Sequence, residues 1–251
     1  MSKSIYSGNY TKAFLSTKVS PSDSIEQSFY NELIEVGEGE GCYIYSFKEN
    51  KLIFSKGLDV MFGIVTEEVN MVLLNSIYEK EFTVFVDEYY DRLLLYLYNN
   101  NKQLKDFSSS IIIKVKDYEF PVYVNIKVLK TDANGNLVSI IGIVKRMAEL
   151  KTTNVVQYSL KGVADQNFTD KVNFGLDHNL CISEDNIKLI ELIEKDETKE
   201  TISKTLSTST ESIQNRLKDL YRRFNVNSEK DLVEFAKTNF IIPNQFEIFN
   251  L

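Results

Sequence analysis

The chain has few of the residues on which many enzymes depend. Its 251 residues include one histidine, two cysteines, three prolines and no tryptophan. One histidine, His178, and two cysteines cannot supply a Cys/His zinc site, and no nucleophile motif lies near His178. The sequence also has no Gly-Lys-Ser or Gly-Lys-Thr phosphate loop. We therefore expect a protein that is not an enzyme, with no catalytic residue, no metal and no obligatory cofactor.

Long apolar runs are also absent. No stretch approaches the ~18 consecutive apolar residues that a membrane helix needs. The first ten residues, MSKSIYSGNY, lack the apolar core of a secretion signal. We therefore expect a cytoplasmic protein with no membrane partner. Cys42 and Cys181 fall in two different regions, which favours buried, reduced thiols over a disulfide framework.

The length and pattern of the chain predict two domains. It has enough apolar material, 43% of its residues, for two modest cores, and its pattern changes near residue 150. We expect a polar N-terminal segment over residues 1–24 and a first domain over 25–148. A connector over 149–181 then leads to a second domain over 182–251.

Alternation of apolar and polar residues predicts a half-buried antiparallel sheet in the first domain. Asn134-Gly135 accepts the positive φ angles of a tight turn between its last two strands. A long helix rich in Phe, Tyr and Leu is expected over 81–98. The expected strands are residues 42–47, 51–55, 110–116, 121–129 and 137–144.

The order of two strands, several helices and three strands over residues 25–148 resembles a PAS sensor domain. The Gly57–Gly63 segment after the second strand and the closing long hairpin are most similar. The resemblance implies a five-stranded antiparallel sheet with helices folded across one face. Such a fold can enclose a ligand, but an aromatic interior is more often core than a cofactor pocket. Ligand-binding residues are left unassigned.

The second domain carries four helical patterns joined by tight polar connections. Ser207-Thr208-Ser209 supplies a turn and an N-cap between the second and third patterns, because a hydroxyl there can accept from the unpaired amides of the next helix. The apolar positions at helical spacing are Leu189, Ile190, Leu192, Ile193, Ile202, Leu206, Ile213, Leu217, Leu220, Tyr221, Phe224, Leu232, Val233 and Ala236.

This segment, from Ile182 to Ala236, resembles the LuxR or GerE type of helix-turn-helix domain. The chain departs from the family pattern at Asn186, where glutamate would close a capping box, at Asp196, where glycine is usual, and at Gln214, where lysine is frequent. The matching positions are Ile182-Ser183, Leu189-Ile190, Leu192-Ile193, Ile202, Leu206, Ser209, Ile213, Tyr221-Arg222-Arg223, Val226 and Leu232-Val233.

The resemblance implies an α+β chain whose C-terminal, all-α four-helix domain binds double-stranded DNA. We expect the recognition helix over 210–224. The overall charge of −7 argues against nucleic acid, but residues 199–223 carry six Lys and Arg against three Asp and Glu, a net charge of +3. The expected base-reading residues are Gln214, Asn215 and Lys218, and the expected phosphate contacts are Lys199, Ser212, Arg222 and Arg223.

These expectations describe a transcriptional regulator that works as a homodimer, because two heads on a symmetric dimer read two half-sites. Dimerisation is expected through an N-terminal apolar stripe, Ile25, Phe29, Leu33 and Val36, with a smaller contact from the last helix over 231–240. The first domain senses a small-molecule or protein signal, or is purely an interaction module. A receiver domain would need a parallel sheet, which the expected antiparallel hairpins contradict. Lactone-sensing domains rely on tryptophan, which this chain lacks. An enzyme is the remote alternative.

Overall fold

The structure is a computed structural model that describes residues 30, 33–64, 69, 74–99, 107–147, 155–162 and 181–243. The chain has an α+β fold, as the sequence predicts. The described elements are β1 (Glu40–Ser46), β2 (Lys51–Lys56), α3 (Leu58–Phe62), α5 (Lys80–Asn99), β3 (Ser108–Lys114), β4 (Pro121–Thr131), β5 (Leu137–Arg146), β6 (Val156–Lys161), β7 (Cys181–Ser183), α7 (Glu184–Glu194), α8 (Lys199–Thr205), α9 (Thr210–Phe224) and α10 (Glu229–Thr238).

A seven-stranded sheet, in the order β2-β1-β5-β4-β3-β6-β7, runs through the described structure. Strands β1 to β5 are those that the sequence predicts, and neighbours among them pair antiparallel. Strand β6 pairs antiparallel with β3, and β7 pairs in parallel with β6. The prediction of a five-stranded, purely antiparallel sheet is therefore corrected: two more strands extend it, and the last of them is parallel.

Strand β6 lies inside the segment 149–181, for which the sequence predicts a connector. Its residues alternate as strand residues do. Val156 and Tyr158 face the core under α5, whereas Gln157 and Ser159 face the other side. This alternation was visible in the sequence, but it covers only a few residues and its pairing partner β3 is distant along the chain.

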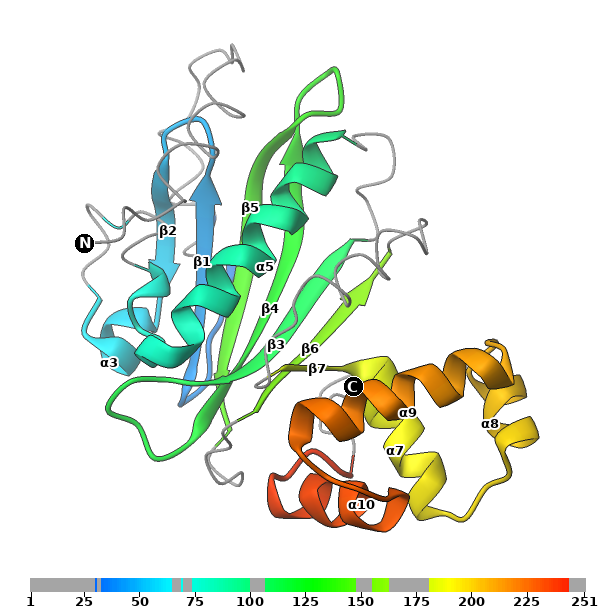
Figure 1. Ribbon diagram of the computed structural model, residues 1–251. Helices are drawn as coiled ribbons and strands as arrows, with labels where there is room; N and C mark the ends of the chain where they lie inside the picture. The colour runs from blue at the N-terminus through cyan, green and yellow to red at the C-terminus, as the bar shows by residue number, and fades with distance from the viewer. Residues whose placement is uncertain are drawn as a thin grey trace.

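Helix α5 lies across one face of the sheet (Figure 1), and aromatic side chains fill the space between them. The rings of Phe85 and Tyr89 stack with centroids 5.4 Å apart, and Tyr89 meets Tyr158 of β6 at 5.5 Å. The Tyr89 hydroxyl is satisfied by Ser109 Oγ at 2.9 Å, so its burial leaves no unpaired polar group. In the described residues this interior is packed core.

Tyr43 of β1 fills this core over Gly142 of β5, its partner in the sheet register. A Cβ at position 142 would lie 2.1 Å from Tyr43 Cζ, far inside van der Waals contact. Glycine at this position therefore allows the tyrosine ring to lie over β5, where it closes the aromatic interior.

The opposite, outer face of the sheet is covered at one end by α7 to α10, a unit that we call the head. Figure 1 shows the head beside β6 and β7, away from β2. Ile112 of β3, Met147 and Val155 belong to the same buried cluster as Ile187 and Ile241 of the C-terminal part. The head and the sheet therefore share one hydrophobic core rather than being joined by an exposed linker.

Candidate nucleic-acid interface

The four helices of the head pack around the apolar positions that the sequence predicts. Leu189, Ile190, Ile202, Ile213, Leu217, Leu220, Phe224, Leu232 and Ala236 are buried. Leu192, Ile193, Leu206, Tyr221 and Val233 are partly buried against the same cluster. The stacked rings of Phe224 and Phe235, with centroids 4.6 Å apart, join α9 to α10. In α8, α9 and α10 the opposite face is largely exposed and therefore available to solvent or a partner.

A hydroxyl caps the N-terminus of every helix in the head. Ser183, Thr198, Ser209 and Ser228 each accept a hydrogen bond from the backbone N–H three residues later. The predicted cap before α9 is thus Ser209, which accepts from Ser212 N at 3.1 Å. Asparagine at position 186 does not remove the first cap, since Asn186 N donates to Ser183 Oγ at 3.4 Å.

The turn between α8 and α9 is tight and well bonded. Ser207 takes a left-handed conformation, with φ of 49°, and its N–H donates to Lys204 O. Ser203 Oγ of α8 donates to the carbonyl of Thr208, which ties the turn to the preceding helix. Helix α9 then begins at Thr210 and ends at Phe224, the bounds that the sequence predicts. The two helices are thereby held in a fixed relation by local hydrogen bonds.

One face of α9 is exposed and polar. Gln214, Asn215 and Lys218 are all exposed, and Lys218 follows the other two by four and three residues. Residues at this spacing lie together on a helix surface, so the three predicted base-reading side chains share one face. Ile213 and Leu217 are buried on the opposite side. The exposed face can offer amide and ammonium groups to a ligand without any rearrangement of the head core.

The two adjacent arginines of α9 have different surroundings. Arg222 is 69% exposed and its guanidinium lies 3.0 Å from Asp219 Oδ1. The Arg223 side chain is only 7% exposed, and its guanidinium donates to the carbonyl of Cys181 and lies 3.4 Å from Asp219 Oδ2. Arg222 is therefore exposed, as a phosphate contact requires, whereas the Arg223 side chain faces the sheet. One feature of the sequence points to this burial: Arg223 precedes Phe224 and lies at the edge of the apolar face of α9.

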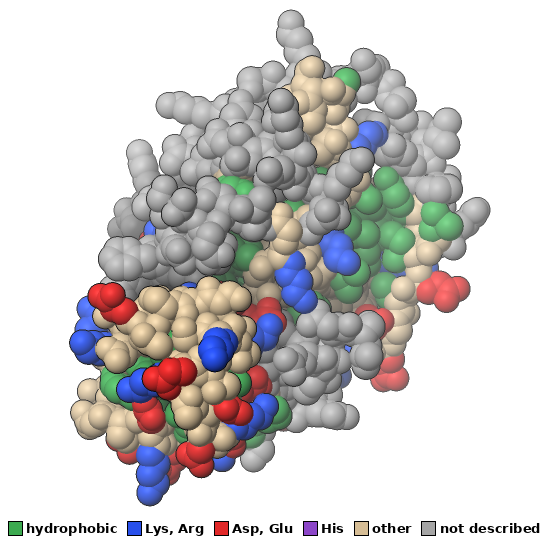
Figure 2. All heavy atoms as spheres, turned by 90° about the vertical axis from the view of Figure 1, so that its right-hand side faces the viewer, with side chains coloured by type: hydrophobic (Ala, Val, Ile, Leu, Met, Phe, Trp, Pro, Cys, Tyr) green, Lys and Arg blue, Asp and Glu red, His purple; other side chains and the backbone are tan. Residues whose placement is uncertain are grey.

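The remaining predicted contacts lie near the N-termini of α8 and α9. Lys199, in the first turn of α8, is exposed, and Ser212, in the first turn of α9, is partly exposed. On the face of the head that Figure 2 shows, Lys and Arg side chains are interspersed with Asp and Glu among other side chains and backbone. The positive charge of this segment is therefore spread out and partly compensated, in particular by Asp219.

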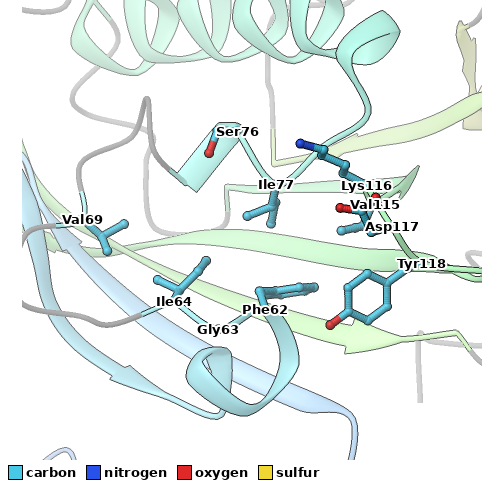
Figure 3. Close-up of a pocket in the computed structure, with 10 residues that line it drawn as sticks. All are labelled: Phe62, Gly63, Ile64, Val69, Ser76, Ile77, Val115, Lys116, Asp117 and Tyr118. Carbon is cyan, nitrogen blue, oxygen red and sulfur yellow. The ribbon is translucent and has the colours of Figure 1, made fainter.

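A separate cavity of about 530 Å³ lies in the N-terminal half, between the end of α3 and the β3–β4 turn. Figure 3 shows Phe62 and Tyr118 at one end of it, with ring centroids 5.8 Å apart, and Ile64, Val69 and Ile77 around the space. Its polar side chains come from Ser76, Lys116, Asp117 and Tyr118. The lining is predominantly apolar, as in many small-molecule sites.

Other kinds of site find little support in the described part of the chain. Within it, no group of three or more His, Cys, Asp or Glu residues could hold a metal ion, and His178 lies outside the described residues. Cys42 and Cys181 are free and buried, as predicted, and burial raises the pKa of the Cys42 thiol to about 11. Among the described helices, none combines the length and apolarity needed to cross a membrane.

Comparison with known proteins gives structural neighbours only. No family model and no curated protein matches the sequence. A phage VqmA–DPO complex is 12% identical, with 84% of this chain and 87% of that chain covered and a TM-score of 0.35. A Vibrio cholerae VqmA–ligand–DNA complex is 11% identical, with 86% of this chain and 88% of that chain covered and a TM-score of 0.30. The N-terminal domain of a Marinobacter aquaeolei diguanylate cyclase with a PAS/PAC sensor is 9% identical, with 44% of this chain and 96% of that chain covered and a TM-score of 0.33. The TM-scores are low, so none superposes closely on this chain.

Proposed function

We propose that the chain is a DNA-binding transcriptional regulator whose head reads operator DNA with α9. The observation that carries the proposal is the exposed face of α9, where Gln214, Asn215 and Lys218 lie together opposite a buried apolar face. Gln and Asn amides match the two-point pattern of adenine in the major groove, and Lys matches guanine. The capped helix and the bonded α8–α9 turn hold these groups in place before DNA arrives.

Phosphate contacts are assigned to two exposed cations and one partly exposed hydroxyl of α8 and α9. Lys199 and Arg222 supply positive charge, and Ser212 supplies a hydroxyl near the N-terminus of α9. Arg223 is left out of this set, although the sequence predicted it there, because its buried guanidinium already holds a backbone carbonyl. Phosphate contacts fix the register of the protein on the duplex, and base contacts give specificity.

A homodimer is part of this proposal, because two heads on one dimer bind two half-sites. Of the predicted dimerisation stripe, Leu33 is exposed and Val36 is packed partly against β1 and β2 residues. Ile25 and Phe29 lie outside the described residues. The exposed Leu33 is consistent with a contact to a second chain in this region.

Arg222→Ala is expected to weaken binding to operator and random DNA by the same factor. A phosphate contact carries no sequence information, so its loss should also reduce the slope of log K against log salt by about one unit. One unit is the largest reduction of the slope that we expect, because Asp219 already compensates part of the Arg222 charge. Fluorescence anisotropy at several salt concentrations measures both effects, and Lys230→Ala on α10 is the control. A slope equal to that of the parent contradicts the phosphate role.

A second role, binding of a small apolar signal molecule, is favoured by the cavity between α3 and the β3–β4 turn. We propose that its apolar lining takes the body of such a molecule and that Lys116 lies near enough to pair with an acidic group. The alternative is a purely protein-binding first domain, which needs no cavity.

The fluorescent probe 1-anilinonaphthalene-8-sulfonate, an apolar ring system with one negative charge, tests this role. The parent protein is expected to bind one probe per chain, and Ile77→Trp, which fills the cavity, is expected to weaken binding about tenfold or more. Val60→Trp adds the same ring on an exposed position of α3 and serves as the control. Equal binding by the parent and Ile77→Trp counts against a ligand in this cavity.

A further inference from the structure

The first residues of the head are part of the sheet. Strand β7 pairs in parallel with β6, with Val156 opposite Cys181 and Tyr158 opposite Ser183. Ser183 is also the N-cap of α7, so no linker separates the last strand from the first helix of the head. Any movement of β7 within the sheet therefore moves the start of α7.

Polar contacts strengthen this junction, by which we mean the contacts of β6 and β7 with the head. Gln157 of β6 is fully buried, and its Nε2 donates to the carbonyl of Phe240 at 3.2 Å. Ser159 of β6 donates to Glu184 in the first turn of α7. Burial opposes ionisation of Glu184, but hydrogen bonds from Ser159 and Lys188, together with the positive charges of Lys188 and Lys161, hold its pKa below the usual value. Gln157 and Ser159, whose side chains face away from α5, thus contact the segment just after α10 and the first turn of α7.

Arg223 joins α9 itself to this junction. Its buried guanidinium donates to the carbonyl of Cys181 on β7 and pairs with Asp219 one turn back on α9. A buried charge is strongly unfavourable without partners, and the planar guanidinium holds two partners in a fixed geometry. These contacts therefore fix the direction of the last turn of α9 relative to β7.

The same junction reaches the aromatic core on the other side of the sheet. Tyr158, the β6 neighbour of β7, packs against Tyr89 and Phe85 of α5 with ring centroids 5.5 and 5.9 Å away. The contacts α5 to β6, β6 to β7, and β7 to Arg223 of α9 are contiguous. Packed side chains and hydrogen bonds of this kind can carry coupling between the first domain and α9.

We infer that Arg223 is a positioning residue that fixes the direction of α9 relative to the sheet through the Cys181 carbonyl. This role rests on the proposed function: in a dimer held together by the sheet domains, the direction of α9 determines which spacing of half-sites both heads can reach. Arg223 then contributes to DNA recognition without contacting DNA. Its neighbour Arg222, which shares Asp219 but is exposed, has no such role.

The experiment compares Arg223→Met with the matched variant Arg222→Met in the full chain. Without DNA, amide hydrogen exchange in β7 and in the last turn of α9 is expected to rise about tenfold in Arg223→Met, because a charge-assisted hydrogen bond across the junction is lost. Arg222→Met should exchange as the parent does. If Arg223→Met exchanges at the same rates as the parent, the inference is overturned.

DNA binding supplies the second readout. With a selected operator and versions whose half-sites are moved apart by one or two base pairs, the parent should discriminate between spacings. Arg223→Met should lose about tenfold of that discrimination while keeping its affinity for one half-site, because the base-reading face is intact. Unchanged discrimination overturns the inference. Arg223→Lys keeps the charge but not the two-point geometry, so it should give the same loss if Arg223→Met fails to fold.

The two readouts separate this inference from the proposed function. If the parent binds no DNA, the proposed function fails and the role of Arg223 in DNA spacing fails with it, whereas exchange still reports whether Arg223 ties α9 to β7. If the parent binds operator DNA but Arg223→Met matches it in exchange and in spacing, the positioning role fails and the proposed function stands.

Discussion

Ile112→Ala is expected to lower the free energy of unfolding by about 2 to 5 kcal/mol, the usual cost of truncating a fully buried isoleucine. Ile112 lies on the outer face of β3, away from α5, where a sheet without the head would leave it uncovered. It is 1% exposed because it belongs to the cluster that the sheet shares with the head. Denaturant unfolding followed by circular dichroism measures the change.

Ile143→Ala is the matched control for this effect. Ile143 is on the outer face of β5 and 42% exposed, so its truncation creates no sealed cavity. We expect a cost of about 1 kcal/mol or less, mostly from the lower strand preference of alanine. If both substitutions cost the same small amount, the head does not cover β3 in solution, and the junction described above is absent.

Gln214→Ala and Lys218→Ala are each expected to lose about 1 to 3 kcal/mol of binding free energy on the true operator and little on random DNA. Both side chains are exposed on α9, so neither substitution removes a core contact. The loss comes instead from bonds to base edges, which exist only on the correct sequence. Anisotropy titrations with both kinds of DNA give the difference directly.

Arg222→Ala provides the comparison for these variants, because a phosphate contact weakens both kinds of DNA alike. Thermal unfolding of the three variants is expected to match the parent, which separates recognition from stability. Should the Gln214 and Lys218 variants bind operator as tightly as the parent, α9 does not read bases.

Local signals in the sequence were sufficient for most of the elements. Alternation predicted strands β1 to β5, and helical spacing predicted α9 with its bounds at Thr210 and Phe224. The turn at Asn134-Gly135 and the cap at Ser209 were found because each depends on the chemistry of one or two residues. These features are set by interactions within a few residues along the chain.

Contacts between distant segments were not predictable in the same way. Strand β7 is three residues long and is a strand only because β6 lies beside it. The burial of Arg223 depends likewise on the carbonyl of Cys181, 42 residues earlier in the chain. Charge and helical position alone therefore assigned this arginine to DNA, whereas tertiary packing turns it toward the sheet. The cavity beside α3 has the same origin, since its lining comes from separate segments.

Above all, we propose that α9 reads the bases of a specific DNA sequence. Selection of bound sequences from a random double-stranded library, with the full chain and Gln214→Ala run in parallel at physiological salt, tests it most directly. The parent is expected to enrich one operator with two related half-sites, and Gln214→Ala should lose preference at one position of each half-site while keeping the others. A parent that enriches no sequence, or a variant with the same preference at every position, would contradict the claim.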